Sequence, residues 1–175
     1  MPKLLYAARL ARPDLVFSIN MLSRFLTKWS AFHDRALHRL LSYVNTTRAK
    51  LLRGFVGSGD VYLNLYCDAD FAGCDWLTLS GDDWSFPLEW GSKRQTCVSH
   101  STPEAELVSL AKGLREAGLP LRTLLETVLD KTIIMKVQED NMSTIQIINK
   151  GRSPALRHLA KTHRVSLAWV SELRQ

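Results

Sequence analysis

The chain has few of the features that mark secreted, zinc-binding or membrane-spanning proteins. Its 175 residues include three cysteines, an odd number whose spacing matches no zinc motif. No apolar run approaches the ~20 residues that a membrane-spanning helix needs, and the first residues lack the apolar core of a secretory signal. Low-complexity segments and internal repeats are also absent. We therefore expect reduced thiols in an intracellular protein, cytoplasmic or nuclear, with no membrane partner.

Positive charge is concentrated at the front of the chain. Residues 1–50 contain nine Lys or Arg against two Asp or Glu, whereas residues 51–175 contain fourteen against fifteen. A basic front and a mildly acidic body suit a protein whose front lies along phosphates while its body holds cations. A solvated helical surface would have the same composition, so both interpretations of the basic front stay open.

The apolar pattern predicts a mainly helical front and a mixed body, with a boundary near residue 48. Helices are expected over residues 4–28 and, after the capping residue Ser30, to about residue 47. Strands are expected at residues 51–56, 61–66, 88–90 and 133–137, the last of them buried. Further helices are expected at residues 103–128, with a kink or break near Gly113, Gly118 and Pro120, at 143–149 and at 154–174. Strands followed by alternating helices predict a mixed α/β sheet with helices packed on it.

Three short acidic motifs lie far apart in this sequence. Asp68 follows a predicted strand, Glu106 lies at the start of a predicted helix, and the third motif, Glu139–Asn141 with Asp140 at its centre, follows another strand. Carboxylates from two strand ends and a helix can converge, and convergent carboxylates bind hard cations such as Mg²⁺. Two such ions about 4 Å apart hold the attacking and leaving oxygens of a phosphodiester in line. The pattern predicts a metal-dependent nuclease, although Glu106 would also suit a helix cap.

Four motifs, taken in order, resemble the ribonuclease H domain of copia-type LTR retrotransposon polyproteins. They are Tyr66–Cys74 (YCDADFAGC), Glu89–Gln95 (EWGSKRQ), Ser101–Glu106 (STPEAE) and Asp140–Ser143 (DNMS). Parts of residues 12–39 resemble the segment that joins the reverse transcriptase to that domain. The resemblance implies a helical connection segment over residues 1–48 and an RNase H-like domain over 49–175, truncated at its C-terminus. It also implies a five-stranded mixed sheet flanked by helices, with an N-terminal helical extension.

The resemblance also implies an activity and its ligands. The activity is hydrolysis of the RNA strand of an RNA–DNA hybrid with two Mg²⁺ ions, for which Mn²⁺ would substitute, beside the reverse transcriptase portion of the polyprotein. Asp68, Glu106 and Asp140 would hold the metal ions, with Glu104 as the runner-up for Glu106. The positions implied to lie near nucleic acid are Asn141, Lys93, Arg94 and Gln95. Asn141 also suits an ordinary turn, and the other three also suit solvated positions at a strand end.

The sequence departs from the family pattern at the fourth acid and in the hairpin. Ala160 stands where the resemblance implies an aspartate, and His158 or His163 would then take over part of the handling of water as a general base. The hairpin before Trp90 is short and contains Pro87, which predicts a shortened or irregular strand. Whether the protein is an enzyme therefore stays open. The alternatives to an active ribonuclease H are an impaired module that binds the hybrid and a decayed retroelement fragment.

Overall fold

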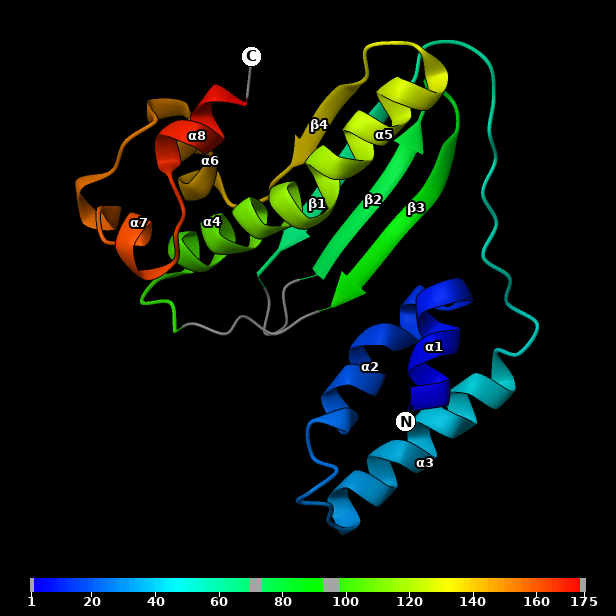
Figure 1. Cartoon of the computed structure of the whole chain (residues 1–175). Helices are drawn as coiled ribbons and strands as arrows, with labels where there is room; N and C mark the ends of the chain where they lie inside the picture. Colours follow the sequence, from blue (N-terminus) through cyan, green and yellow to red (C-terminus); the bar gives the residue numbers. More distant parts are fainter. Residues whose placement is uncertain (1, 70–73, 93–97, 174–175) are drawn as a thin grey trace.

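A computed structural model describes residues 2–69, 74–92 and 98–173, which form helices on a mixed sheet (Figure 1). The N-terminal helices are α1 (Pro2–Ala11), α2 (Pro13–Ser23) and α3 (Ala31–Thr46). The strands are β1 (Tyr62–Asp68), β2 (Cys74–Ser80), β3 (Ser85–Ser92) and β4 (Ile134–Gln138). The remaining helices are α4 (Thr102–Gly113), α5 (Leu119–Leu129), α6 (Met142–Lys150), α7 (Leu159–Thr162) and α8 (Leu167–Glu172). A π-helical turn (Leu114–Gly118) joins α4 to α5, and a 3₁₀ turn (Pro154–Leu156) precedes α7.

The sheet confirms the predicted mixed α/β class. Its order is β3-β2-β1-β4, with β1 antiparallel to β2 and parallel to β4. The described residues form four strands, and the fifth that the resemblance implied is not among them. Because β1 and β4 are parallel, their C-terminal ends lie at the same edge of the sheet. Residues that follow these two strands are thereby brought close together.

The main core lies between the sheet and α4. Alternate residues of β1 point to one face, where Leu63, Leu65 and Cys67 are buried against Leu107 and other side chains of α4. Each fully buried leucine contributes roughly 1.5–3 kcal/mol of hydrophobic stabilisation. The predicted break near Gly118 is confirmed as the π-helical turn, where an added Cβ would lie 3.1 Å from the sulfur of Met135. A larger residue there would push the side chains of Met135 and Leu65 by a few tenths of an ångström.

The hairpin of β2 and β3 differs from the prediction in length. Both strands are full, at seven and eight residues, so the predicted shortening is wrong. The predicted irregularity is present, because the register shifts between Leu77 and Thr78, and Thr78 pairs with Pro87. Proline has no N–H to donate to the ladder, which explains the shift. The strand predicted at residues 51–56 is also wrong: the segment has no regular structure, and Phe55 N–H donates to the carbonyl of Ser85 at 3.5 Å.

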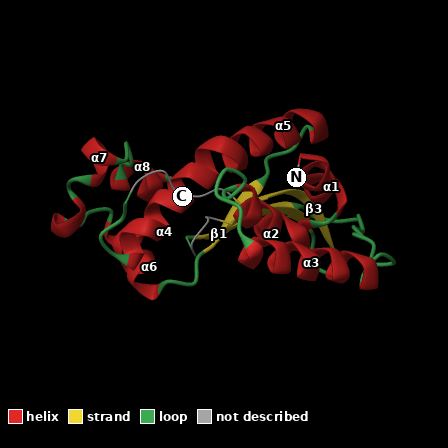
Figure 2. Ribbon diagram, turned by 90° about the horizontal axis from the view of Figure 1, so that it is seen from below, coloured by secondary structure: helices red, strands yellow, loops and turns green. Residues whose placement is uncertain are grey.

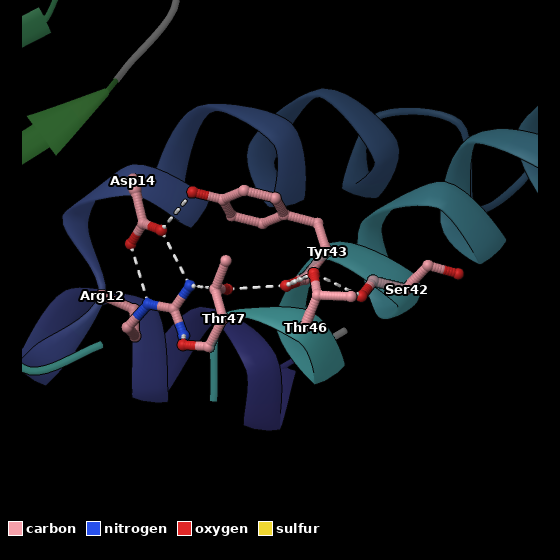
Figure 3. A network of polar contacts seen from close by, with 6 residues as sticks. All are labelled: Arg12, Asp14, Ser42, Tyr43, Thr46 and Thr47. Carbon is pink, nitrogen blue, oxygen red and sulfur yellow. Dashed lines mark hydrogen bonds and ion pairs between the residues drawn. The ribbon is translucent and has the colours of Figure 1, made fainter. Parts of the chain in front are cut away.

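The first three helices have a core of their own, built from Ala8, Leu15, Val16, Ile19, Leu22 and Leu40. The single helix predicted over residues 4–28 is wrong, since α1 ends before Arg12 and α2 begins at Pro13, whose missing N–H suits a first turn. Arg12 donates two hydrogen bonds to Asp14, at 2.9 and 2.8 Å, and one of 2.7 Å to the hydroxyl of Thr47 (Figure 3). These bonds tie the start of α2 to the end of α3 and hold the pKa of Asp14 below its ordinary value.

The N-terminal helices contact the sheet through β3, as the view from below shows (Figure 2). The side-chain amide of Asn20 donates to the carbonyl of Ser92 at 2.6 Å, and the indole N–H of Trp90 donates to the carbonyl of Ala8 at 3.1 Å. Helix α3 begins after the predicted cap, Ser30, with a capping box to His33. The boundary near residue 48 stays a prediction.

The C-terminal part differs most from the sequence-based expectation. The single helix predicted over 154–174 is wrong: the chain forms a 3₁₀ turn, α7 and α8, with Arg164 at a left-handed φ of 54° between the two helices. Strand β4 lies where it was predicted, but it is an outer strand with Ile134 66% exposed, not a buried one. No helix in the described part of the chain is both long and apolar enough to cross a membrane.

Candidate metal centre

Three carboxylates gather at the edge of the sheet where β1 and β4 end. Glu106, Glu139 and Asp140 each offer one oxygen, and these oxygens lie within 4.8 Å of one another. Glu106 comes from α4, whereas Glu139 and Asp140 follow directly after the last residue of β4. The group thus brings together two of the three predicted ligands, Glu106 and Asp140, and adds a residue that the prediction left out.

Hydrogen bonds to the end of β1 fix the position of Glu106. Its side chain is buried, and its Oε2 accepts a hydrogen bond of 2.9 Å from the backbone N–H of Ala69. One turn further along α4, the hydroxyl of Ser109 donates to the carbonyl of Asp68 at 3.3 Å. Helix α4 is therefore bonded to the end of β1 around Glu106, so the direction of its carboxylate is set before any ligand binds.

Asp68, the third predicted ligand, is the exposed last residue of β1 and lies outside the group of three. It is nevertheless close enough for its charge to act on the group, because it contributes to raising the pKa of Glu139. The structure therefore places Asp68 beside the group, on the same edge of the sheet.

Glu139 belongs to the third acidic motif, but it is the member of the group that was not predicted as a ligand. Burial raises its pKa to about 7, and the charges of Glu106, Asp140 and Asp68 add to that effect against a hydrogen bond from the N–H of Asn141. Its Oε1 accepts that bond at 3.1 Å, while its Oε2 is buried and has no hydrogen-bond partner among the described residues. Two adjacent acids after an apolar strand were the available signal, but the resemblance directed attention to Asp140 alone.

Glu104, the runner-up for Glu106, has a different environment. It is 1% exposed, and its Oε2 accepts from the N–H of His100 at 2.9 Å. Its Oε1 is hydrogen-bonded to Nε2 of His158 at 3.0 Å and to Nε2 of His163 at 3.1 Å. Burial raises the pKa of Glu104, but the bonds from His100 and His158 outweigh it, and the pKa is lowered. The predicted catalytic residue His158 is thus bonded to Glu104, away from the group of three.

The positions predicted to contact nucleic acid are only partly described. Asn141 caps α6, and its side-chain oxygen accepts from the backbone N–H groups of Ser143 and Thr144 at 3.0 and 3.1 Å. The side-chain oxygen of Asn141 therefore stabilises the start of α6, and its contact with nucleic acid stays a prediction. Lys93, Arg94 and Gln95 lie outside the described residues. Ala160, at the position of the fourth acid, is an exposed residue of α7.

The donor set fits a hard divalent cation. All donors of the group are carboxylate oxygens, which Mg²⁺ and Mn²⁺ prefer, and the group contains no imidazole or thiolate that would favour zinc. A buried carboxylate oxygen without a donor costs free energy, and a bound cation would remove that cost. The fold and this site together define a mixed α/β protein with a candidate site for a divalent cation.

The sequence of the chain is similar to those of several known proteins. The chain is 33% identical over 126 residues to the secreted RxLR effector protein 161 of Plasmopara viticola, covering 69% of this chain and 88% of that protein. It is 31% identical over 120 residues to a transposon Ty5-1 protein of Saccharomyces cerevisiae, covering 65% of this chain and 39% of that protein. It is 33% identical over 118 residues to the retrovirus-related Pol polyprotein from transposon TNT 1-94 of Nicotiana tabacum, covering 65% of this chain.

These relatives give the family. The chain belongs to the same family as the Plasmopara viticola protein. Its homologues also include Ty/copia-type retrotransposon Pol polyproteins, which match part of the chain at 31–35% identity. It spans 39% of the yeast relative and 9% of the tobacco polyprotein, so it corresponds to a part of those proteins. Neither a protein-family model nor a solved structure matches the chain.

Proposed function

We propose that the chain is a ribonuclease H-type module of a retrotransposon reverse transcriptase, which hydrolyses the RNA strand of RNA–DNA hybrids. The observation that carries this proposal is the group of carboxylates at the ends of β1 and β4. The order of the acidic motifs along the chain and its relationship to Pol polyproteins support it. The natural partner of the module would be the reverse transcriptase portion of the same polyprotein.

Glu106 and Asp140, with Asp68 beside them, would hold Mg²⁺, or Mn²⁺ in its place. A bound pair of these ions would supply an activated water and would stabilise the leaving 3′ oxygen of the RNA. The chain itself supplies orientation, because the bond from Ala69 to Glu106 holds that carboxylate at the end of β1. It also supplies concentrated negative charge, which attracts divalent cations to this edge of the sheet.

The basic helices would provide affinity for the hybrid. Arg24, Lys28, Arg35 and Arg39 are exposed on or next to α2 and α3. Lysine and arginine bind nucleic-acid phosphates without reading sequence. Selection of a hybrid would then come from its A-like groove and 2′-hydroxyl groups.

A second candidate is a module that binds the hybrid without cutting it. Ala160 favours this candidate, because it offers no carboxylate at the position where the family pattern has a fourth acid. A weakened second metal position would lower cleavage and leave phosphate binding intact. In that case Ala160→Asp would restore cleavage to a chain that already binds.

Cleavage of an end-labelled RNA–DNA hybrid by the purified chain tests the proposal, in Mg²⁺ and separately in Mn²⁺. The wild-type chain and the control Asp82→Asn, an exposed acid in the hairpin, are expected to cut the RNA strand, and Asp140→Asn is expected to be silent. Equal cleavage by wild type and Asp140→Asn would contradict the proposal. Tight hybrid binding without cleavage in either metal, with activity gained in Ala160→Asp, would establish the second candidate.

A further inference from the structure

We propose that Glu139 is an additional metal ligand of this site, beside Glu106 and Asp140. The inference rests on the proposed function, since it concerns the same site. Its basis is geometric: one oxygen of Glu139 lies within 4.8 Å of an oxygen of Glu106 and of one of Asp140. The residue enters the group because it is the first residue after β4, on the edge of the sheet that carries Asp68.

The two oxygens of Glu139 have unequal surroundings. Oε1 accepts the hydrogen bond from Asn141, whereas Oε2 is buried and lacks a partner among the described residues. The described ion pairs do not include Glu139 either. A buried carboxylate oxygen without a donor is rare in folded proteins and calls for an explanation. A cation shared with Glu106 and Asp140 would supply the missing partner.

The surroundings of Glu139 would strengthen such a bond. The residue lines a cavity of about 590 Å³ between β4, α4, α5, α6 and α8, together with aliphatic side chains such as Leu110 and Ile145 and polar ones such as Arg122 and Asn149. The side chain of Glu139 is half-buried, which weakens solvent screening of its charge. A cation would therefore be attracted more strongly than to a carboxylate surrounded by water.

The two histidines nearest to Ala160 in the sequence are bonded to Glu104. Ala160 has no side-chain oxygen, and His158, two residues earlier, is bonded to Glu104. His163, three residues later, is bonded to the same carboxylate oxygen. Glu139 is thus the described residue that extends the predicted ligand set of Asp68, Glu106 and Asp140 to four carboxylates.

Calorimetric titration of the full chain with Mn²⁺ tests the inference without any measurement of activity. We expect Glu139→Gln, which keeps the shape of the side chain, to bind Mn²⁺ about tenfold more weakly or worse. The matched control is Glu172→Gln, an exposed glutamate in α8, which should bind as the wild type does. Far-ultraviolet circular dichroism checks that each variant is folded. If Glu139→Gln does not fold, Glu139→Asp, which withdraws the oxygens by one methylene, is expected to show the weakened binding instead.

A parallel titration of Asp140→Asn separates the two proposals. Weak binding in both Asp140→Asn and the Glu139 variant supports the inference. Weak binding in Asp140→Asn with wild-type affinity in the Glu139 variant would overturn the role of Glu139 and leave the proposed function intact. Wild-type affinity in both variants, or a wild-type chain that binds no Mn²⁺, would overturn the metal site and with it both proposals.

Discussion

Two glutamates on α4 lie two residues apart, both are buried, and their surroundings are opposite. Glu104 accepts hydrogen bonds from a backbone N–H and from two imidazoles, and its pKa is lowered. Glu106 instead faces Glu139 and Asp140, and the pKa of Glu139 is raised to about 7. A buried carboxylate with enough donors stabilises the fold, whereas carboxylates crowded together destabilise it unless a cation binds. The comparison separates Glu104, a structural acid, from Glu106, a candidate metal ligand on the same helix.

The largest expected effect on cleavage comes from removing one carboxylate from the group of Glu106, Glu139 and Asp140. Asp140→Asn removes one charge and one oxygen donor from it, and should lower Mg²⁺-dependent cleavage of a hybrid by about 100-fold or more. Single-turnover kinetics at saturating enzyme measures this loss apart from binding. A decrease that is matched by Asp82→Asn would show that the change has nothing to do with the group.

Removing Glu104, which accepts hydrogen bonds from His100, His158 and His163, should lower stability instead of metal binding. Glu104→Ala leaves two imidazoles without their buried acceptor, and should lower the free energy of unfolding by about 3 kcal/mol. Urea denaturation monitored by circular dichroism measures the change, with Glu172→Ala as the exposed control. Loss of Mn²⁺ binding in a folded Glu104→Ala sample would contradict the separation of the two acids.

The raised pKa of Glu139 predicts how stability depends on pH in the absence of metal. The folded chain holds a proton on Glu139 up to about pH 7, whereas the unfolded chain loses it near 4.5. The folded state therefore binds more protons between these values, and stability falls as the pH rises through that window. Glu139→Gln has no proton to lose in this pH range. After a discount for solvent screening, the variant should therefore avoid about 1 kcal/mol of the pH-dependent decrease in the free energy of unfolding.

Urea denaturation in EDTA at pH 5 and pH 8 measures the dependence. Glu139→Gln is expected to be more stable than the wild type at pH 8 and to approach it at pH 5. Identical pH dependence in the two chains would contradict the crowding of charge at the end of β4.

The smallest effect is expected at His158, whose side chain is 39% exposed. His158→Ala removes one of the donors to Glu104 and should lower the free energy of unfolding by about 1 kcal/mol. If its role is structural, Mn²⁺ affinity and cleavage should be unchanged. A large loss of cleavage at unchanged Mn²⁺ affinity would assign His158 the catalytic part that the sequence predicted.

The sequence predicted the elements whose signals are local. Ser30 lies at the start of α3 as predicted, because caps depend on a few neighbouring residues. The break after α4 followed from glycine and proline in the same way. Residues 154–174 were predicted as one helix because their apolar spacing is helical, but Arg164 adopts a left-handed φ and ends α7. The spacing of apolar residues alone does not reveal such a break in a helix.

The failures of the site prediction have a tertiary cause. Sequence spacing indicated Asp68, Glu106 and Asp140, but it contains no information on how closely Glu139 approaches Glu106 or on how much of Glu139 is buried. The fate of Glu104 depends on His158 and His163, more than fifty residues away. The exposure of β4 likewise depends on its position at the edge of the sheet, because an apolar run is the same in an inner or an outer strand.

The most direct measurement is an anomalous difference map from a crystal of the chain soaked in Mn²⁺. We expect a peak between the carboxylates of Glu106, Glu139 and Asp140, at the end of β4. A map in which these three carboxylates are ordered and no Mn²⁺ lies among them would contradict the proposed metal centre.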